Sequence, residues 1–259
     1  MIEKYCWQRG DGNKKMKKIL ITGATRGIGW MLAQKAAAAG LEVILQGRNP
    51  YVLREKKLIL SKKTNKVMTS CFDIRNRTAA KRELARIVDI DYIVNNAGMI
   101  ADNWWEKMCI EDWDDVLATN LTGAFNVTKA LTPKLNPNGQ IIFMTSQAGL
   151  LGNPGQANYS AAKAALIGLT YTLAAELQRC SIRVNAVSPG AVTEMTAPVI
   201  AKLKAKYGEL PVEWQLGSTE AVAEFILAEV LPTTRTGTIF AVNGNRNGYW
   251  SKPQYVPLR

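Results

Sequence analysis

Residues 17–48 read KKILITGATRGIGWMLAQKAAAAGLEVILQGR, and this stretch decides the fold. An apolar run leads into a turn with three glycines, an alanine-rich helical segment follows, and a second apolar run ends the stretch. A strand, a helix and a strand in this order form one βαβ unit, and glycine permits the tight turn between the first two. Strands joined by a crossover helix lie parallel, so the stretch predicts a parallel sheet covered by helices.

The rest of the chain repeats this alternation. Short apolar runs occur at VMTSCF, DYIVNNAG, QIIFMTS, RVNAVSPG and GTIFAVNG, with segments of helical length between them. The pattern predicts an α/β fold with a single doubly wound parallel sheet of the Rossmann type and helices on both faces. We expect one dinucleotide-binding catalytic domain over residues 17–259, after a basic, disordered tail over residues 1–16. Residues 195–217 interrupt the alternation with extra helical sequence, and their place after a strand predicts a lid over the carboxyl ends of the strands.

Composition excludes several classes of function. The chain has no histidine, so it can build no Ser-His-Asp triad, no Cys-His dyad and no His-ligated metal site, and we expect no metal. Its four cysteines form no CxxC pair, which is typical of reduced thiols in the cytosol. No apolar run approaches the roughly 18 residues of a membrane span, and the start lacks the apolar stretch of a signal peptide. We therefore expect a cytoplasmic protein that does not contact membranes.

The net charge of +12 is concentrated in two stretches of the sequence. Residues 1–18 hold six Lys or Arg against two Asp or Glu, and residues 43–90 hold twelve against four. We interpret the second stretch as a solvated helix face beside an anionic cofactor. A cofactor-sensing regulator or a nucleic-acid-binding protein is the remote alternative.

The glycine turn over residues 22–29 predicts a cradle for a dinucleotide, because its backbone amides can approach a pyrophosphate at the positive end of the following helix. Its spacing is GxxxGxG rather than GxGxxG, so a simple strand-to-helix turn is the alternative. Where NAD-binding chains place a carboxylate after the second strand, this chain has Arg48, which can pair with a 2′-phosphate or simply cap the strand. Arg26 adds a second cation, and the two together indicate NADP(H).

Tyr159 and Lys163 are four residues apart and therefore share one face of a predicted helix. A free phenol has a pKa of about 10, but an adjacent ammonium and an oxidised nicotinamide both favour the phenolate. Tyr159 could then exchange a proton with a substrate oxygen. A chance YxxxK on an amphipathic helix is the alternative.

The chain resembles the short-chain dehydrogenases/reductases over roughly residues 17–245. The motifs TGxxxGxG, NNAG at 95–98, Asn120, Ser146, YxxxK and SPG at 188–190 occur in the order typical of that family. The resemblance implies that Ser146 holds the substrate oxygen and that Tyr159 is the general acid. It also implies that Lys163 binds the nicotinamide ribose and lowers the pKa of the tyrosine, and that Asn120 holds a water in the proton relay. The residues expected to contact the cofactor are Gly23, Ala24, Thr25, Arg26, Gly27, Ile28, Gly29, Arg48, Asp73, Ile74, Asn96, Ala97, Gly98, Tyr159, Lys163, Pro189, Gly190, Val192 and Thr193.

Within that family, residues 101–130 and 152–170 look most like 3-oxoacyl-acyl-carrier-protein reductases. This implies NADPH-dependent reduction of a ketone to a secondary alcohol, with a carrier-linked 3-oxoacyl group as substrate. An NADP(H)-linked reductase or dehydrogenase of a free ketone, polyol, steroid or secondary metabolite is the alternative. The expected substrate contacts are Ser146, Gln147, Tyr159, Trp104 and Trp105.

Two departures from those reductases concern the substrate and the end of the chain. Trp104 and Trp105 are bulky at the expected substrate entrance and could instead pack against the lid. The last turn reads NGNRNGYW rather than ending in paired glycines. The resemblance also implies a homodimer or homotetramer that pairs through helices at about 112–134 and 157–179.

Overall fold

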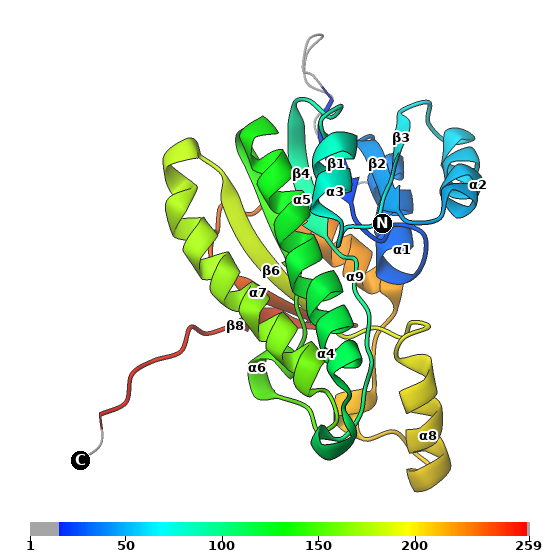
Figure 1. Cartoon of the computed structure of the whole chain (residues 1–259), viewed down its shortest axis with the longest axis vertical. Coiled ribbons are helices and arrows are strands. Elements are labelled where there is room, and N and C mark those ends of the chain that lie inside the picture. Colours follow the sequence, from blue (N-terminus) through cyan, green and yellow to red (C-terminus); the bar gives the residue numbers. More distant parts are fainter. Residues whose placement is uncertain (1–15, 258–259) are drawn as a thin grey trace.

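The structure, a computed structural model, describes residues 16–257 of the chain (Figure 1). The tail expected over residues 1–16 lies, apart from Met16, outside the described residues. No helix within residues 16–257 is long and apolar enough to cross a membrane.

One eight-stranded sheet with the order β3-β2-β1-β4-β5-β6-β7-β8 runs through the described chain. Neighbouring strands are parallel except β7 and β8, which form an antiparallel hairpin at one edge. The predicted doubly wound parallel sheet is thus confirmed, with one antiparallel edge strand added. The strands are β1 (Lys18–Ile21), β2 (Glu42–Gly47), β3 (Val67–Cys71), β4 (Ile90–Asn95), β5 (Leu135–Met144), β6 (Arg183–Pro189), β7 (Ile239–Asn243) and β8 (Arg246–Trp250).

Helices cover both faces of the sheet (Figure 1). The α-helices are α1 (Gly27–Ala38), α2 (Pro50–Ser61), α3 (Arg77–Leu84), α4 (Ile110–Leu117), α5 (Gly123–Leu131), α6 (Ala148–Leu151), α7 (Ala157–Glu176), α8 (Ala197–Tyr207) and α9 (Thr219–Phe225). Buried side chains of α1, α2 and α9 join one apolar core, and those of α3, α5 and α7 join the other.

The apolar run of β1 shows why the sequence forms a fully buried strand. Successive side chains of a strand point to opposite faces of the sheet. Ile19 and Ile21 accordingly lie in the core under α1, and Leu20 lies in the core under α5 and α7. Because both faces are covered, the run is apolar at every position instead of alternating.

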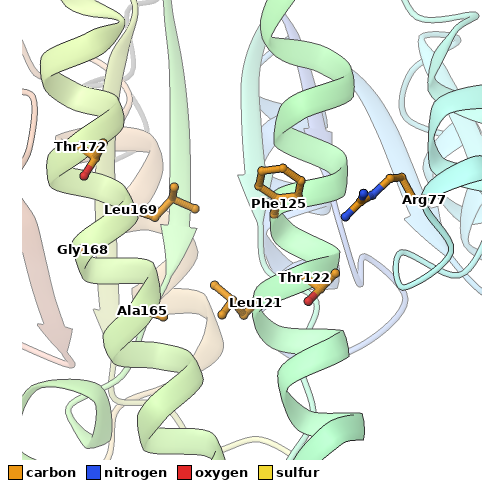
Figure 2. A pocket seen from close by; sticks show the side chains of 8 residues that line it. All are labelled: Arg77, Leu121, Thr122, Phe125, Ala165, Gly168, Leu169 and Thr172. Atoms are coloured by element: carbon orange, nitrogen blue, oxygen red, sulfur yellow. The ribbon is translucent and has the colours of Figure 1, made fainter.

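The outer face between α5 and α7 carries a hollow of about 470 Å³ (Figure 2). Phe125 of α5 points into it and is 40% exposed, and the Arg77 guanidinium lies 5.7 Å from the phenyl ring. The hollow is lined by Arg77, Leu121, Thr122, Phe125, Ala165, Gly168, Leu169 and Thr172. These residues lie within the two helical segments expected to pair between subunits, apart from Arg77.

The chain leaves the regular alternation between β6 and α9. Residues 190–218 hold α8 and a short 3₁₀ turn, η5 (Val212–Trp214), and α8 lies beyond the sheet at the same end of the molecule as α6 (Figure 1). This excursion coincides with the predicted lid over residues 195–217.

Candidate active site

The sheet order reverses between β1 and β4, and the crevice at this switch point is where ligands bind in open α/β sheets. The glycine turn lies in this crevice with two positions that exclude a side chain. Gly23 has a φ of +63°, and a Cβ added there would lie 2.9 Å from Ala97 Cα. A Cβ on Gly29 would lie 2.5 Å from the carbonyl oxygen of Gly23. The two glycines therefore allow a close packing of turn, helix and β4 that any larger residue would disturb.

The N-terminus of α1 is available to an anion. Arg26 is its N-cap residue, with an extended backbone and no side-chain capping bond, and the first turn contains no acidic residue. The first amides of a helix lack partners within it and carry the positive end of the helix dipole. This arrangement suits a pyrophosphate, as the sequence predicts for residues 23–29.

Asn96 and Gln46 hold the glycine turn from two sides. The Asn96 side-chain amide donates to the carbonyl oxygen of Thr22 at 2.9 Å, which explains its place beside the turn. The Gln46 side chain accepts from the amide of Gly23 at 3.3 Å and donates to the carbonyl oxygen of Phe72 at 2.7 Å. Gln46 was not predicted from the sequence, because its role depends on β2 lying between the turn and β3.

The two arginines assigned to a 2′-phosphate have different surroundings. Arg48 follows β2 and is exposed. Arg26 forms an ion pair with Glu194 at 3.1 Å, in which both side chains are about 70% exposed. Exposed ion pairs contribute little to stability, about 0–1 kcal/mol, so a phosphate can compete with Glu194 for this guanidinium.

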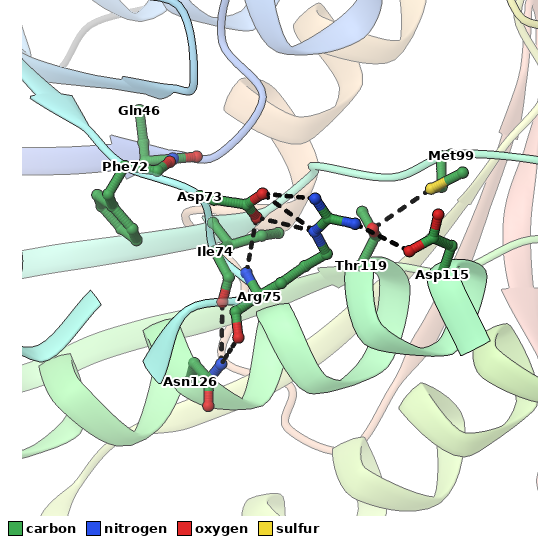
Figure 3. Close-up of polar contacts among 9 residues, drawn as sticks. All are labelled: Gln46, Phe72, Asp73, Ile74, Arg75, Met99, Asp115, Thr119 and Asn126. Carbon is green, nitrogen blue, oxygen red and sulfur yellow. Dashed lines mark hydrogen bonds and ion pairs between the residues drawn. The ribbon is translucent and has the colours of Figure 1, made fainter. Parts of the chain in front are cut away.

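Asp73 and Ile74 lie at the carboxyl end of β3, where Asp73 is held by Arg75 (Figure 3). Two guanidinium nitrogens of Arg75 donate to Asp73 Oδ2 at 3.0 and 2.8 Å, and a third donates to Asp115 of α4 at 2.9 Å. Burial works to raise the pKa of Asp73, but the hydrogen bonds from Arg75 outweigh it and the pKa is lowered. Asn126 of α5 donates to the carbonyl oxygen of Ile74 at 2.9 Å and so fixes this loop.

The structure brings Ser146, Tyr159 and Lys163 together at the carboxyl end of β5. Lys163 is buried and donates to the carbonyl oxygen of Met144 at 2.6 Å, while its Nζ lies 5.4 Å from the centre of the Tyr159 ring. Ser146 follows β5 and is hydrogen bonded to Tyr159. Tyr159 and Lys163 share one face of α7, as their spacing predicts. Their catalytic roles stay predictions.

The pKa of Tyr159 differs from the sequence-based expectation. Burial of the hydroxyl raises it to about 12, and the hydrogen bond from Ser146, which favours the phenolate, offsets only part of this. Burial also lowers the pKa of Lys163 to about 8. The expected lowering of the Tyr159 pKa is therefore not seen here, because removal from water disfavours the charged form of both groups.

Asn120 is fully buried in a π-helical turn, η2 (Ala118–Thr122), between α4 and α5. Its side chain donates to the carbonyl oxygen of Met99 at 2.9 Å and accepts from the Met99 amide at 2.8 Å. A Cβ on Gly98 would lie 3.2 Å from Asn120 Oδ1 and 3.7 Å from Lys163 Nζ. The Asn120 amide thus holds the segment after β4 against the site, and its expected role in holding water stays a prediction.

A cavity of about 270 Å³ opens beside Ser146 and Tyr159. The excursion after β6 supplies one wall, and Asp102 and Gln156 contribute polar atoms to another. Gln156 donates to Asp102 at 2.8 Å, and burial raises the pKa of this carboxyl. The cavity is lined by Ile100, Asp102, Ser146, Gln147, Ala148, Leu151, Gly152, Asn153, Gln156, Tyr159, Pro189, Met195, Thr196, Val199, Trp214 and Leu216.

The structure places Trp104 and Trp105 outside this cavity wall. They lie at the start of a short 3₁₀ turn, η1 (Trp105–Lys107), and are 60% and 74% exposed. The tryptophan that lines the cavity is Trp214 of η5, which the sequence analysis missed. Its position within residues 195–217, the predicted lid, could have indicated that it faces the substrate. Gln147, by contrast, lines the cavity where the resemblance puts it.

The segment after β6 closes the crevice opposite the glycine turn. Pro189 lines the cavity, and the Gly190 amide donates to the carbonyl oxygen of Val242 at 2.7 Å. A Cβ on Gly27 would lie 3.9 Å from Thr193 Cγ2, so Thr193 reaches the start of α1. Val192 is 49% exposed. The glycine turn, expected to hold the pyrophosphate, and residues 189–193, expected to contact the cofactor as well, thus face one crevice.

Comparison with known proteins gives three consistent findings. The family model described as short chain dehydrogenase matches residues 17–204. The chain is 40% identical to a 3-oxoacyl-acyl-carrier-protein reductase of Aquifex aeolicus over 88% of this chain and 96% of the relative, and 35% identical to one of Synechocystis over 87% and 94%. It superposes with a TM-score of 0.78 and 30% identity on a variant of the actinorhodin polyketide ketoreductase solved with NADPH, covering 88% of this chain and 96% of that one.

Proposed function

The chain belongs to the short-chain dehydrogenase family, and we propose that it reduces a ketone to a secondary alcohol with NADPH, the ketone being a 3-oxoacyl group on an acyl carrier protein. The observation that carries this proposal is the meeting of Ser146, Tyr159 and Lys163 at the carboxyl end of β5, beside a cavity that can hold a substrate. Relatives that are 35–40% identical and named for this reaction support the substrate class.

The residues present fit a nicotinamide dinucleotide. Because Gly23 and Gly29 have no side chain, the turn packs closely on Ala97 and on α1, and the open N-terminus of α1 lies in the same crevice. The glycine turn would hold the pyrophosphate, Arg26 and Arg48 the 2′-phosphate, and Lys163 the nicotinamide ribose. When bound, the nicotinamide supplies a hydride to the carbonyl carbon.

Tyr159 supplies the proton. With its pKa raised to about 12, the phenol is fully protonated at neutral pH and can act as a general acid. Ser146 and Tyr159 both donate hydrogen bonds to the carbonyl oxygen and stabilise the negative charge that develops on it. The Lys163 ammonium, behind the ring, favours the phenolate that forms once the proton has been transferred.

The cavity favours a short, partly apolar substrate. Met195, Val199, Trp214 and Leu216 provide apolar side chains along the wall formed by the excursion after β6. The volume of about 270 Å³ lies just below the range typical of small-molecule sites, about 300–1,000 Å³, which suits a substrate whose bulk stays outside. An acyl group presented by a carrier protein has this property. We assign residues 195–217 as the lid that covers it.

The experiment compares three substrates by the loss of NADPH absorbance: a 3-oxoacyl group on an acyl carrier protein, the same group on a small thiol, and a free cyclic ketone. We expect the highest kcat/KM with the carrier-linked group. Preference for the free ketone would instead favour the alternative of a reductase for an unattached metabolite.

Tyr159→Phe should lower turnover by about 10²–10⁴-fold while NADPH binding stays nearly intact. Turnover within a few-fold of the parent would refute the assignment of the acid.

We also propose that the subunits pair through α4, α5 and α7. The apolar hollow between α5 and α7, with Phe125 40% exposed, supports this face, because exposed apolar patches of this kind often mark subunit contacts. Phe125→Glu should shift the mass measured by light scattering toward the monomer. An unchanged oligomer in this variant would place the interface elsewhere.

A further inference from the structure

The last hairpin of the chain is bonded to the excursion after β6. Arg246 begins β8, directly after the two-residue turn at Gly244 and Asn245. Its guanidinium donates to the carbonyl oxygen of Gln215 at 2.8 Å and to that of Val212 at 3.3 and 3.4 Å. These two carbonyls stand on either side of Trp214.

We call residues 212–217 the return segment. Within it, Trp214 and Leu216 line the cavity. The Trp214 amide donates to the carbonyl oxygen of Pro211 at 2.8 Å, and the Leu216 amide to that of Trp214 at 2.9 Å. The segment is thus a tight turn, in which the Gln215 amide also donates to the carbonyl oxygen of Val212 at 3.2 Å. Arg246 adds a further donor to the Val212 carbonyl and donates to the carbonyl oxygen of Gln215, so it ties the turn to the hairpin at two points.

A second contact seats the same segment on the same hairpin. The Gly217 amide donates to Asn243 Oδ1 at 2.8 Å, and a Cβ on Gly217 would lie 2.7 Å from Gly244 Cα. The two backbones therefore touch where neither residue has a side chain. The return segment has a fixed base at Gly217, and Arg246 orients the turn that precedes it.

We infer that Arg246 is a positioning residue for the substrate cavity: by holding both carbonyls that flank Trp214, it fixes the indole as a wall and limits the size of the ketone that fits. This inference rests on the proposed function. The planar guanidinium presents several donors in a fixed fork, so it can hold two carbonyls at once, whereas a lysine ammonium acts from a single point. Arg246 belongs to the stretch NGNRNGYW, which departs from those reductases, and this residue thereby gains a role.

The test measures the return segment and the kinetics separately. In Arg246→Ala, hydrogen exchange of the amides of residues 214–217 should accelerate roughly ten-fold. Local opening of the segment in the parent must break its hydrogen bonds to the guanidinium, and the variant has none of these bonds to break. The KM for a 3-oxoacyl thioester should rise about 3- to 10-fold while kcat and the Kd for NADPH change less than about two-fold. Arg246→Lys should fall between the parent and the alanine variant.

Two controls separate this inference from a general loss of structure. Arg235→Ala removes a guanidinium that lies 4.9 Å from the Tyr249 ring on the same hairpin, and it should leave exchange of residues 214–217 unchanged. In a Trp214→Ala background, Arg246→Ala should alter KM less than about two-fold, because coupled residues are not additive.

Each outcome bears on the inference. Unchanged exchange in Arg246→Ala would overturn the anchoring role, and an equal rise of KM with or without Trp214 would overturn the route through the indole. If the parent reduces none of the ketones, the proposed function fails while the exchange experiment still tests the anchor.

Discussion

Replacing Gly29 with alanine tests whether the glycine turn is required by packing. Gly29 lies in the first turn of α1, and its added Cβ would lie 2.5 Å from the carbonyl oxygen of Gly23. Side chains essentially never approach a backbone oxygen this closely. Relief requires α1 to move away from the turn, and the side chain of Asn96, which also faces Gly29, must move with it.

The expected magnitude follows from two opposing contributions. Forcing one methyl group into a closely packed site costs about 1–3 kcal/mol. Alanine in a helix gains about 0.5–1 kcal/mol over glycine. We expect Gly29→Ala to lose about 1–2 kcal/mol of unfolding free energy, which lowers Tm by about 2–8 °C in a chain of this size. The Kd for NADPH should rise as well, because the turn that holds the pyrophosphate is displaced.

Gly168→Ala provides the matched control. Gly168 lies inside α7, is exposed, and a Cβ there would have no heavy atom within 4 Å. Because Gly168 also lines the hollow proposed as a subunit contact, the comparison is made in the Phe125→Glu background, which removes that contact. The helix propensity gain of about 0.5–1 kcal/mol is then unopposed, so Tm should rise by about 1–4 °C. Replacing glycine with alanine should thus lower Tm at Gly29 and raise it at Gly168.

The assay is thermal unfolding followed by circular dichroism, together with a fluorescence titration with NADPH. A Gly29→Ala protein that melts within a degree of the parent and binds NADPH equally well would show that the packing between the turn, α1 and Asn96 accommodates a side chain. The steric account of the glycine turn would then be wrong.

Three further outcomes test the cofactor and proton assignments. Arg48→Asp should raise the KM for NADPH more than that for NADH, because a carboxylate repels a 2′-phosphate and accepts from ribose hydroxyls; an unchanged preference would remove Arg48 from the cofactor site. Lys163→Ala should weaken both turnover and NADPH affinity, unlike Tyr159→Phe, and equal NADPH binding in the two variants would contradict the ribose contact. Since burial lowers the pKa of Lys163 to about 8 and raises that of Tyr159 to about 12, kcat/KM for reduction should fall as pH rises through about 8, where the ammonium is lost and the phenol is still protonated. In Lys163→Arg, whose guanidinium stays charged, any residual activity should be level up to about pH 10, and a fall near pH 8 in this variant would assign the titration to another group.

Local patterns in the sequence determined the sheet, the glycine turn and the face shared by Tyr159 and Lys163. Each depends on residues that are near one another in the chain: an apolar run makes a buried strand, and a four-residue spacing aligns two side chains on a helix. The structure agrees with these expectations, and the family match over residues 17–204 agrees with the resemblance. The antiparallel strand β8 was not foreseen, because its pairing depends on the turn that replaces the paired glycines.

Contacts between distant segments and burial could be decided only by the tertiary structure. Trp214, not Trp104 or Trp105, lines the cavity, because the path of residues 190–218 above the sheet is set by the packing of Gly217 on Gly244 and by Arg246. The pKa of Tyr159 likewise depends on how far folding removes its hydroxyl from water. The sequence by itself determines which residues can do the chemistry, and the folded chain determines which of them share one site, because proximity and burial arise from segments that the sequence holds far apart.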